Sequence, residues 1–262
     1  MHTAEYTFSQ RSVTCYFDAD FRGLSGLVKD GNMIIITDEN VFNEHAEILA
    51  GSRVIKIAAG ETNKNQATVD QIIRELINLG AHKNTFLIGL GGGVVTDITG
   101  YVAAVYMRGI KFGLVPTTIL AMVDAAIGGK NGIDVGVYKN MVGTIRQPEF
   151  IFYDYSFLDT LPVREWINGF AEIIKHACIK DALLFAKLER YSLHDYQADP
   201  TLIAELIENN VEIKAQVVTR DEFEKGERKL LNFGHTVGHA IENLLGIPHG
   251  QAVSIGMVAA CN

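Results

Sequence analysis

Three of the eight histidines of this chain lie close together, at positions 235, 239 and 249. His235 and His239 are four residues apart, which places both imidazoles on one face of a helix, and His249 follows shortly after. Neutral imidazoles are common metal ligands, so the spacing indicates half of a divalent metal site. A metalloprotease is excluded, because Thr236 stands where the motif His-Glu-x-x-His has its general base. The alternative is that the glycine-flanked histidines only pack against another helix.

The carboxylate that would complete the site is Glu172. The residues around it, 170–177, are apolar on both sides of Glu172, Lys175 and His176, which predicts a largely buried helix. A buried carboxylate needs a cation or a metal beside it, whereas a surface salt bridge between Glu172 and Lys175 is the simpler interpretation. Two imidazoles and a carboxylate leave a coordination position open, as in catalytic zinc sites.

A second candidate site lies in the first half of the chain. An apolar strand pattern at 85–90 runs into three glycines, 91–93, and then into a helix. Glycines at a strand-to-helix turn let backbone N–H groups approach a phosphate, so a pyrophosphate cradle is one interpretation. The segment is not Gly-x-Gly-x-x-Gly, and a tight turn that packs on the sheet is the other interpretation.

Further polar residues follow strand ends or glycines. Thr117 and Thr118 end the next strand pattern and can bind a ligand or cap a helix. Lys130 follows two glycines, and either it holds a phosphate or carboxylate or it is a solvated surface lysine. Arg228 ends a charged segment, which is either a solvated turn or a bidentate clamp for a substrate carboxylate.

Charge and composition restrict the partners. A net charge of −8 and a pI near 5.5 argue against nonspecific binding to nucleic acid or to anionic membranes. No apolar run is long enough to span a bilayer, and the N-terminal residues lack a signal core. The chain has only 3 cysteines, and they lie far apart in the sequence, so we expect a cytoplasmic protein without disulfides.

The chain divides by pattern near residue 160. Residues 33–37, 53–58, 85–90, 112–116 and 150–154 read as buried strands, and 69–77 as an amphipathic helix that stops at Gly80. From residue 161 on, apolar residues recur only at helical spacing. We predict an α/β N-terminal domain with a parallel, Rossmann-like sheet (1–160), followed by an all-α C-terminal domain (161–262). Because the last residues stop within an apolar helical pattern, we expect a truncated chain.

Nine segments resemble, in the same order, those of the 3-dehydroquinate synthase family. They are AGETNK (59–64), GGGVVTD (91–97), VPTT (115–118), VDAAIGGKNG (123–132), KN (139–140), FLDTLP (157–162), AEIIKHA (171–177), LNFGHTVGHA (231–240) and HG (249–250). This family of sugar phosphate cyclases shares a fold with glycerol dehydrogenase. The resemblance implies a lyase of the shikimate pathway, which leads to chorismate and the aromatic amino acids. Such an enzyme converts 3-deoxy-D-arabino-heptulosonate 7-phosphate to 3-dehydroquinate and phosphate with bound NAD and zinc, or cobalt.

The resemblance also implies roles for individual residues. The zinc ligands would be Glu172, His235 and His249. NAD would be held by Asp38, Asn40, Glu61, Lys64, Gly92, Gly93, Val94, Asp97, Thr117, Thr118, Lys130, Lys139, Phe157 and Thr160. The substrate would be surrounded by Lys130, Asn140, Lys175, Asn232 and His239 at the phosphate and reacting hydroxyls, by Lys214 and Arg228 at the carboxylate, and by Asp124 at a hydroxyl. Arg108 would reach the neighbouring subunit of a homodimer. His239 thus changes from metal ligand to proton-transfer residue, and His176 has no role.

The chain departs from the family pattern at three places. Ala59 replaces an acidic residue, the segment 132–140 has an unusual loop sequence, and the family continues beyond the position that matches Asn262 with a carboxylate-binding lysine. Two other functions stay open. One is a different cyclase or a metal-dependent polyol dehydrogenase, which would lack the phosphate and carboxylate clamps, and the other is a noncatalytic fragment.

Overall fold

The computed structural model describes residues 1–9, 11–28 and 32–262. The chain forms two compact units, an α/β unit (Met1–Thr117 with Gly128–Thr160) and a helical unit (Thr118–Ile127 with Leu161–Asn262). The sequence predicted a single break near residue 160. The difference is the segment 118–127, which joins the helical unit because its residues pack on helices that come later in the chain.

The α/β unit is built on a seven-stranded sheet in the order β1-β2-β9-β6-β5-β3-β4. In this sheet only β1 and β2 pair antiparallel, and every other neighbouring pair of described strands is parallel. The strands of this sheet are β1 (His2–Thr7), β2 (Ser12–Phe17), β3 (Met33–Asp38), β4 (Val54–Ile57), β5 (Phe86–Gly91), β6 (Lys111–Pro116) and β9 (Phe150–Phe152). All five strands expected from apolar runs are therefore confirmed. The strands β1 and β2 were missed, although buried and less buried residues alternate along β2 as in a half-buried strand.

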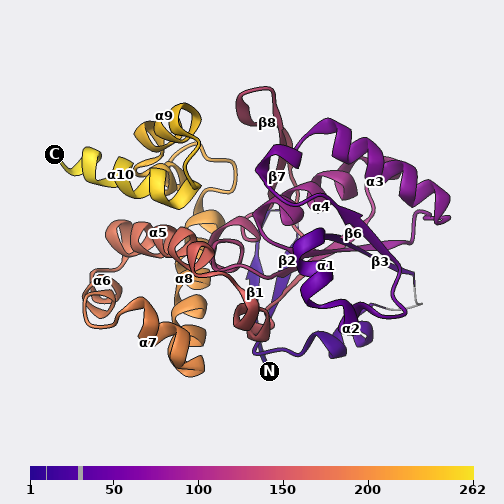
Figure 1. Cartoon of the computed structure of the whole chain (residues 1–262), viewed down its shortest axis with the longest axis horizontal. Coiled ribbons are helices and arrows are strands. Elements are labelled where there is room, and N and C mark those ends of the chain that lie inside the picture. The colour runs from indigo at the N-terminus through magenta and orange to yellow at the C-terminus, as the bar shows by residue number, and fades with distance from the viewer. Residues whose placement is uncertain (10, 29–31) are drawn as a thin grey trace. The chain divides into compact units, whose positions relative to one another are not determined.

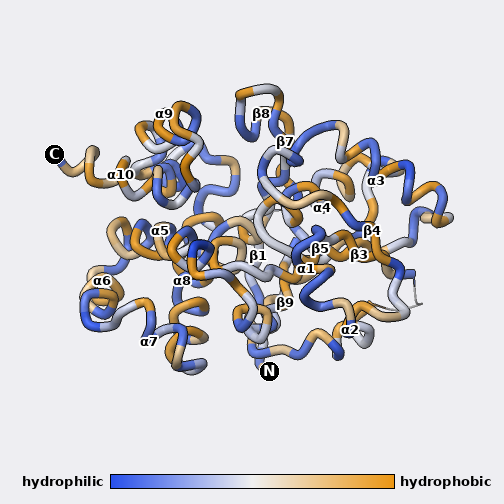
Figure 2. The backbone as a smooth tube through the Cα atoms, viewed as in Figure 1, coloured by the Kyte–Doolittle hydropathy of each residue, from blue (hydrophilic) through white to orange (hydrophobic). Residues whose placement is uncertain are grey.

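The central strands lie between layers that cover both faces, which explains their continuous apolar runs. Ile34, Ile35 and Ile36 of β3 are fully buried, and Figure 2 shows the tube of β3 and β5 as hydrophobic. The helices of this unit are α1 (Glu39–Glu44), α2 (Ala46–Leu49), α3 (Gln66–Asn78) and α4 (Gly93–Val105). The helix α4 follows β5 directly and packs on β5 and β6. This arrangement presents the N-terminus of α4 at the edge where the parallel strands end.

A separate antiparallel hairpin of β7 (Lys130–Val135) and β8 (Tyr138–Ile145) packs on α4. The sequence did not predict it as strands, because β8 has no buried residue to give the pattern a period of two. Asn131 of this hairpin lies against Gly100 of α4. A Cβ atom at Gly100 would lie 1.7 Å from Asn131 Oδ1, so the close contact requires glycine.

The helical unit contains no strand among residues 161–262, all of which are described, as the sequence predicted. Its helices are α5 (Val163–Lys180), α6 (Ala182–Leu188), α7 (Leu193–Ala198), α8 (Pro200–Arg220), α9 (His235–Leu245) and α10 (His249–Cys261). The helices α9 and α10 pack on each other, and α5 contacts α10 and α8 (Figure 1). A π-helical turn at Ala121–Ala125 packs on α5 and α8. Within the described part of the chain, no helix combines the length and the hydropathy needed to cross a membrane.

Candidate active site

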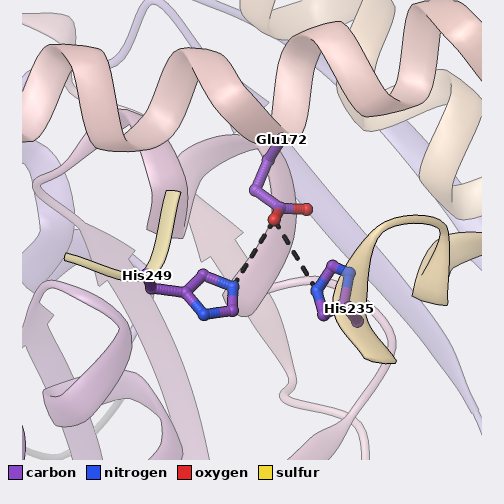
Figure 3. Close-up of side chains that lie close together, drawn as sticks. All are labelled: Glu172, His235 and His249. Atoms are coloured by element: carbon purple, nitrogen blue, oxygen red, sulfur yellow. Dashed lines mark ion pairs between the residues drawn. The ribbon is translucent and has the colours of Figure 1, made fainter. Parts of the chain in front are cut away.

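Three helices of the helical unit bring Glu172, His235 and His249 together (Figure 3). Glu172 lies in the middle of α5, whereas His235 and His249 are the first residues of α9 and α10. Gly234 has a left-handed φ of 79° before α9, and Pro248 precedes α10, so each helix begins at its histidine. Two helix starts are thereby aimed at one carboxylate on a third helix.

The distances within this group suit a metal ion. The Nε2 atoms of His249 and His235 lie 3.5 and 3.8 Å from Oε1 of Glu172. A tetrahedral ion with bonds of about 2 Å holds its ligand atoms roughly 3.3 Å apart, close to this spacing. Oε1 of Glu172 is also buried without a hydrogen-bond partner. A cation between the three side chains would satisfy that oxygen, so the residues fit a bound metal.

The ionisation of the group fits the same use. Burial raises the pKa of Glu172, but the Lys175 ammonium that bonds its other oxygen, together with the imidazoles of His249 and His235, lowers the pKa to about 2. Burial lowers the pKa of His235, which keeps that imidazole neutral. Burial also lowers the pKa of His249, but the neighbouring carboxylates of Glu172 and Glu242 raise it to about 9. An incoming metal ion must therefore displace a proton from His249.

His239 stands one turn after His235 on α9 and belongs to the same cluster. Its ring centroid lies 5.2 Å from that of His235 and 5.8 Å from that of His249. Together with Glu242 and His249 it forms a second group whose potential ligand atoms lie within 4.8 Å of one another. Two potential metal groups thus share His249.

A second polar cluster surrounds Asp124, on the π-helical turn. Lys214 of α8 lies 2.6 Å from Asp124 Oδ1 and donates a 2.5 Å hydrogen bond to the backbone carbonyl of Asp124. Burial opposes ionisation of Asp124, but Lys214 and Lys175 hold the pKa of this carboxyl well below its usual value. Burial lowers the pKa of Lys214 to about 8, although Asp124 counteracts it. The cluster therefore contains an ammonium that gives up its proton unusually easily.

Of the other residues expected at the substrate, Arg228 is buried and Asn232 is exposed. Nη1 of Arg228 donates to the carbonyl of Glu222, and burial lowers the pKa of the guanidinium. Asn232 donates to Glu224 at 2.8 Å and lines an open depression of about 580 Å³ that no metal-site residue lines. The structure thus gathers Asp124, Lys175 and Lys214 with the metal group, while Asn232 bonds elsewhere.

In the α/β unit, expected NAD-binding residues follow the carboxyl ends of three adjacent parallel strands. Asp38 ends β3, Gly92 follows β5, and Thr117 follows β6. No side chain caps α4 at Gly92, so its first N–H groups are open to an anionic ligand. The hydroxyl of Thr117 is buried without a hydrogen-bond partner. Parallel sheets bind dinucleotides at this edge, and the residues fit such a ligand.

A buried lysine, Lys64, connects the hairpin of β7 and β8 to the edge of the sheet at which the parallel strands end. Nζ of Lys64 lies 2.5 Å from Asp97 Oδ2 and donates to the side chain of Asn140 at 2.6 Å. Asn140 has a left-handed φ of 55°, and its N–H donates to Asp134 at 2.7 Å. Burial lowers the pKa of Lys64, but Asp97 and Glu61 outweigh it and raise the pKa. Lys64, Asp97 and Asn140, selected separately from the sequence, thus form one network.

The remaining expected residues of the α/β unit are distributed over its surface and core. Lys139 forms a 3.3 Å ion pair with Glu61, Thr160 lies 3.1 Å from Nε2 of His45, and Phe157 is buried. Asp38 accepts from the N–H groups of Asn40 and Val41, so it caps α1. Lys130 is exposed. In the helical unit, Thr118 caps the next turn by accepting from Ala121 N. None of these contacts contradicts a ligand role.

Two further buried residues lie at this site: the sequence reasoning did not name Glu242, and it named His176 but gave it no role. Glu242 lies 3.1 Å from Nδ1 of His249, and His176, which the resemblance left without a role, lies 3.6 Å from Asp124 Oδ1. Nδ1 of His176 is 3.1 Å from the amide oxygen of Asn210. The spacing of Glu242, seven residues after His235 and on the same helix face, was the available signal. Nothing in the sequence indicated the pair of His176 and Asn210, because the two lie on different helices.

Two family profiles match consecutive parts of the chain. The profile of the 3-dehydroquinate synthase N-terminal region matches residues 54–168, and that of the 3-dehydroquinate synthase C-terminal region matches residues 169–262. A 3-dehydroquinate synthase of Acetivibrio thermocellus is 41% identical over 265 residues, which cover 95% of this chain and 73% of that protein. A pentafunctional AROM polypeptide of Komagataella phaffii is 44% identical over 253 residues, which cover 89% of this chain but only 16% of the polypeptide.

Solved structures of related cyclases have the same fold. A 2-deoxy-scyllo-inosose synthase, complexed with carbaglucose-6-phosphate, NAD+ and Co2+, superposes with a TM-score of 0.87 at 28% identity, covering 99% of this chain and 74% of that one. A 2-epi-5-epi-valiolone synthase from Streptomyces hygroscopicus subsp. jinggangensis, with NAD+ and Zn2+ bound, has a TM-score of 0.84 at 28% identity, covering 98% and 74%. The predicted fold class is confirmed.

Proposed function

The chain belongs to the 3-dehydroquinate synthase family, and from this premise we propose that it converts 3-deoxy-D-arabino-heptulosonate 7-phosphate to 3-dehydroquinate and phosphate. This is the carbon–oxygen lyase step of the shikimate pathway. The metal group on α5, α9 and α10 and the open N-terminus of α4 support the metal- and NAD-dependent chemistry that the reaction needs.

The observation that carries the proposal is the burial of three cationic side chains in one unit of an acidic protein. Lys175, Lys214 and Arg228 are 1%, 6% and 2% exposed, although the chain has a net charge of −8. Buried cations are costly unless anions meet them. Glu172 and Asp124 already pair with Lys175 and Lys214. A substrate with a phosphate and a carboxylate would add anions to the same cationic cluster, whereas the neutral substrate of a polyol dehydrogenase would not. The geometry therefore favours the synthase over the dehydrogenase.

Each cofactor has fitting residues in this chain. We propose that Glu172, His235 and His249 hold zinc, with cobalt as a substitute, and that the strand ends with Asp38, Gly93 and Thr117 hold NAD. When bound, NAD supplies a reversible hydride acceptor for a ring hydroxyl and zinc supplies a Lewis acid beside it. Lys64, Asp97 and Asn140 would support the NAD site through their shared network.

The protein's own side chains would then bind the substrate and move protons. Lys214 and Arg228 would bind the carboxylate, and Asp124 would accept a hydrogen bond from a hydroxyl. His239 lies close to the group of Glu172, His235 and His249 but is not one of its three members. It would exchange a proton with the reacting hydroxyls of the substrate. Lys175 would keep Glu172 ionised and would also face the phosphate and the reacting hydroxyls of the substrate. The resemblance places Lys130, Asn140 and Asn232 around the same groups.

We further propose a cytoplasmic homodimer in which Arg108 reaches the active site of the second copy. Arg108 is exposed and has a left-handed φ of 59°, next to Met107 at 49°. Such backbone conformations cost free energy in residues other than glycine and are concentrated at functional sites. The strained backbone at Met107 and Arg108 is therefore consistent with an Arg108 side chain that is held out toward a second copy of the chain. Sedimentation of the wild type would test the dimer, and phosphate release by an Arg108→Ala variant that still dimerises would test the role of the side chain.

The test of the activity is release of inorganic phosphate from the heptulosonate phosphate. Protein loaded with NAD and zinc should release one phosphate per 3-dehydroquinate formed, without net reduction of NAD. Protein that retains both cofactors and binds the substrate but releases no phosphate would contradict the assignment. Oxidation of glycerol with accumulation of NADH would favour the dehydrogenase instead.

A further inference from the structure

Glu242 is a buried carboxylate beside the metal group. It lies on α9, two turns after His235, and its side chain is 8% exposed. Its Oε2 atom is 3.1 Å from Nδ1 of His249, whereas Nε2 of the same ring faces Glu172 (Figure 3). The imidazole of His249 thus lies between two carboxylates, one on each nitrogen.

This arrangement determines which nitrogen of His249 can bind a metal. A neutral imidazole carries its proton on one nitrogen, and an acceptor at that nitrogen fixes the tautomer and the plane of the ring. Glu242 accepts at Nδ1, which leaves the lone pair on Nε2, the atom that faces Glu172 and lies near His235. We infer that Glu242 is a positioning residue that holds His249 in the tautomer and orientation in which Nε2 binds the metal.

The geometry argues against Glu242 as a metal ligand itself. The group of His239, Glu242 and His249 is also compact enough for an ion. However, its carboxylate oxygen already bonds His249, whereas Oε1 of Glu172 is buried with no hydrogen-bond partner. The Glu172 oxygen that lacks a hydrogen-bond partner indicates where the ion binds, whereas the Glu242 oxygen that bonds His249 indicates a supporting contact. Removal of a supporting carboxylate of this kind lowers metal affinity by about 10–100-fold.

The test compares metal affinity, measured by chelator competition, for the wild type, Glu242→Leu and Glu242→Gln. The Leu variant should bind zinc about 10–100-fold more weakly. The Gln variant should bind more tightly than the Leu variant, because its amide oxygen can still accept from Nδ1. Glu212→Leu, at an exposed position on α8, is the control and should leave the affinity unchanged. Wild-type affinity in Glu242→Leu overturns the inference, and loss of zinc in both variants assigns Glu242 as a direct ligand, which also overturns it.

A second measurement uses only the wild-type protein, so it does not depend on whether a variant folds. Nitrogen-15 spectra of the histidines in the zinc-loaded wild type should show Nδ1 of His249 protonated and Nε2 bound to metal. Metal on Nδ1 would overturn the inference. The inference rests on the proposed metal site, and the two can fail separately. A wild type that binds no zinc contradicts the site itself, whereas a wild type that binds zinc no more tightly than Glu242→Leu contradicts only the role of Glu242.

Discussion

Lys214 and Asp124 are 90 residues apart in the sequence, yet Lys214 holds both the backbone carbonyl and the carboxylate of Asp124. The contact has two consequences. It fixes the π-helical turn to α8, and it places a buried ammonium with a lowered pKa beside a carboxylate that stays ionised. The first consequence concerns the fold, and the second gives a pH dependence that can be measured.

We expect substrate binding to weaken as the pH rises through 8. Because burial lowers the pKa of Lys214 to about 8, the ammonium is present below that pH and is lost above it. If Lys214 binds the substrate carboxylate, KM should be constant below pH 8 and rise above it by at most roughly tenfold per pH unit. Steady-state kinetics across this range would measure the inflection. A Lys214→Met variant should show a high KM without the inflection, and an inflection of the same size in that variant would exclude Lys214 as its source.

Metal content should distinguish the ligands from their histidine neighbour. Glu172→Ala and His249→Ala should lose the zinc, because each removes one of the three ligands, whereas His239→Ala should keep one zinc per chain. The His239→Ala variant should nevertheless lose activity by about 10²–10⁴-fold, the usual contribution of a proton-transfer group. Elemental analysis after gel filtration, combined with the phosphate assay, measures both. Zinc retained by Glu172→Ala and His249→Ala would refute the ligand assignment.

Breaking the buried ion pair of the α/β unit should destabilise the protein. In Asp97→Asn the ammonium of Lys64 stays buried with one anion fewer, and we expect a loss of about 2–4 kcal/mol in the free energy of unfolding. Urea unfolding followed by circular dichroism measures this loss. Glu205→Gln breaks the ion pair with Lys187, whose two side chains are 58% and 30% exposed, and should cost at most about 1 kcal/mol. Equal costs for the two variants would show that the burial of Lys64 is unimportant.

The contact between α9 and α10 should tolerate no side chain at Gly256. A Cβ atom there would lie 1.9 Å from the carbonyl oxygen of Gly234, which cannot move aside without shifting the turn before His235. Gly256→Ala should therefore cost about 1–3 kcal/mol and weaken zinc binding together with stability. Thermal unfolding with and without zinc is the measurement. Gly23→Ala, with no atom within 4 Å of the new methyl group, is the control and should change neither quantity appreciably.

The sequence predicted the parts of the fold whose signals are local. The runs around Ile35, Ile88 and Ile151 identified buried parallel strands, and the period of Val69, Ile72 and Leu76 identified α3. The hairpin of β7 and β8 gave no such signal, because its outer strand is mostly exposed. The assignment of residues 118–127 to the helical unit depends on distant partners such as Lys214, which periodicity cannot reveal.

The candidate site, like the fold, contains some residues that could be predicted from the sequence and others that could not. Residue type and spacing predicted the cluster of His235, His239 and His249, and only the family resemblance selected His235 and His249 as ligands. Glu172 was predicted from its apolar surroundings, and the structure brings it close to these two histidines. Glu242 was not named and His176 was named without a role, because their importance lies in what their side chains contact, at 3.1 Å from His249 and 3.6 Å from Asp124. Residues that contact substrate or metal tend to have recognisable types, whereas supporting residues are recognised only by their neighbours.

The path of the backbone between the two units affects how the protein can be assembled. The chain passes from one unit to the other at 117/118, 127/128 and 160/161. During synthesis, Asp124 leaves the ribosome long before Lys214 exists, so the turn that carries it must wait for its partner helix. A protease cut at 160/161 would likewise release no complete unit, since each fragment would lack or carry over the segment 118–127. The two units are therefore distinct in structure but inseparable as polypeptides, and neither can be expressed as one continuous fragment.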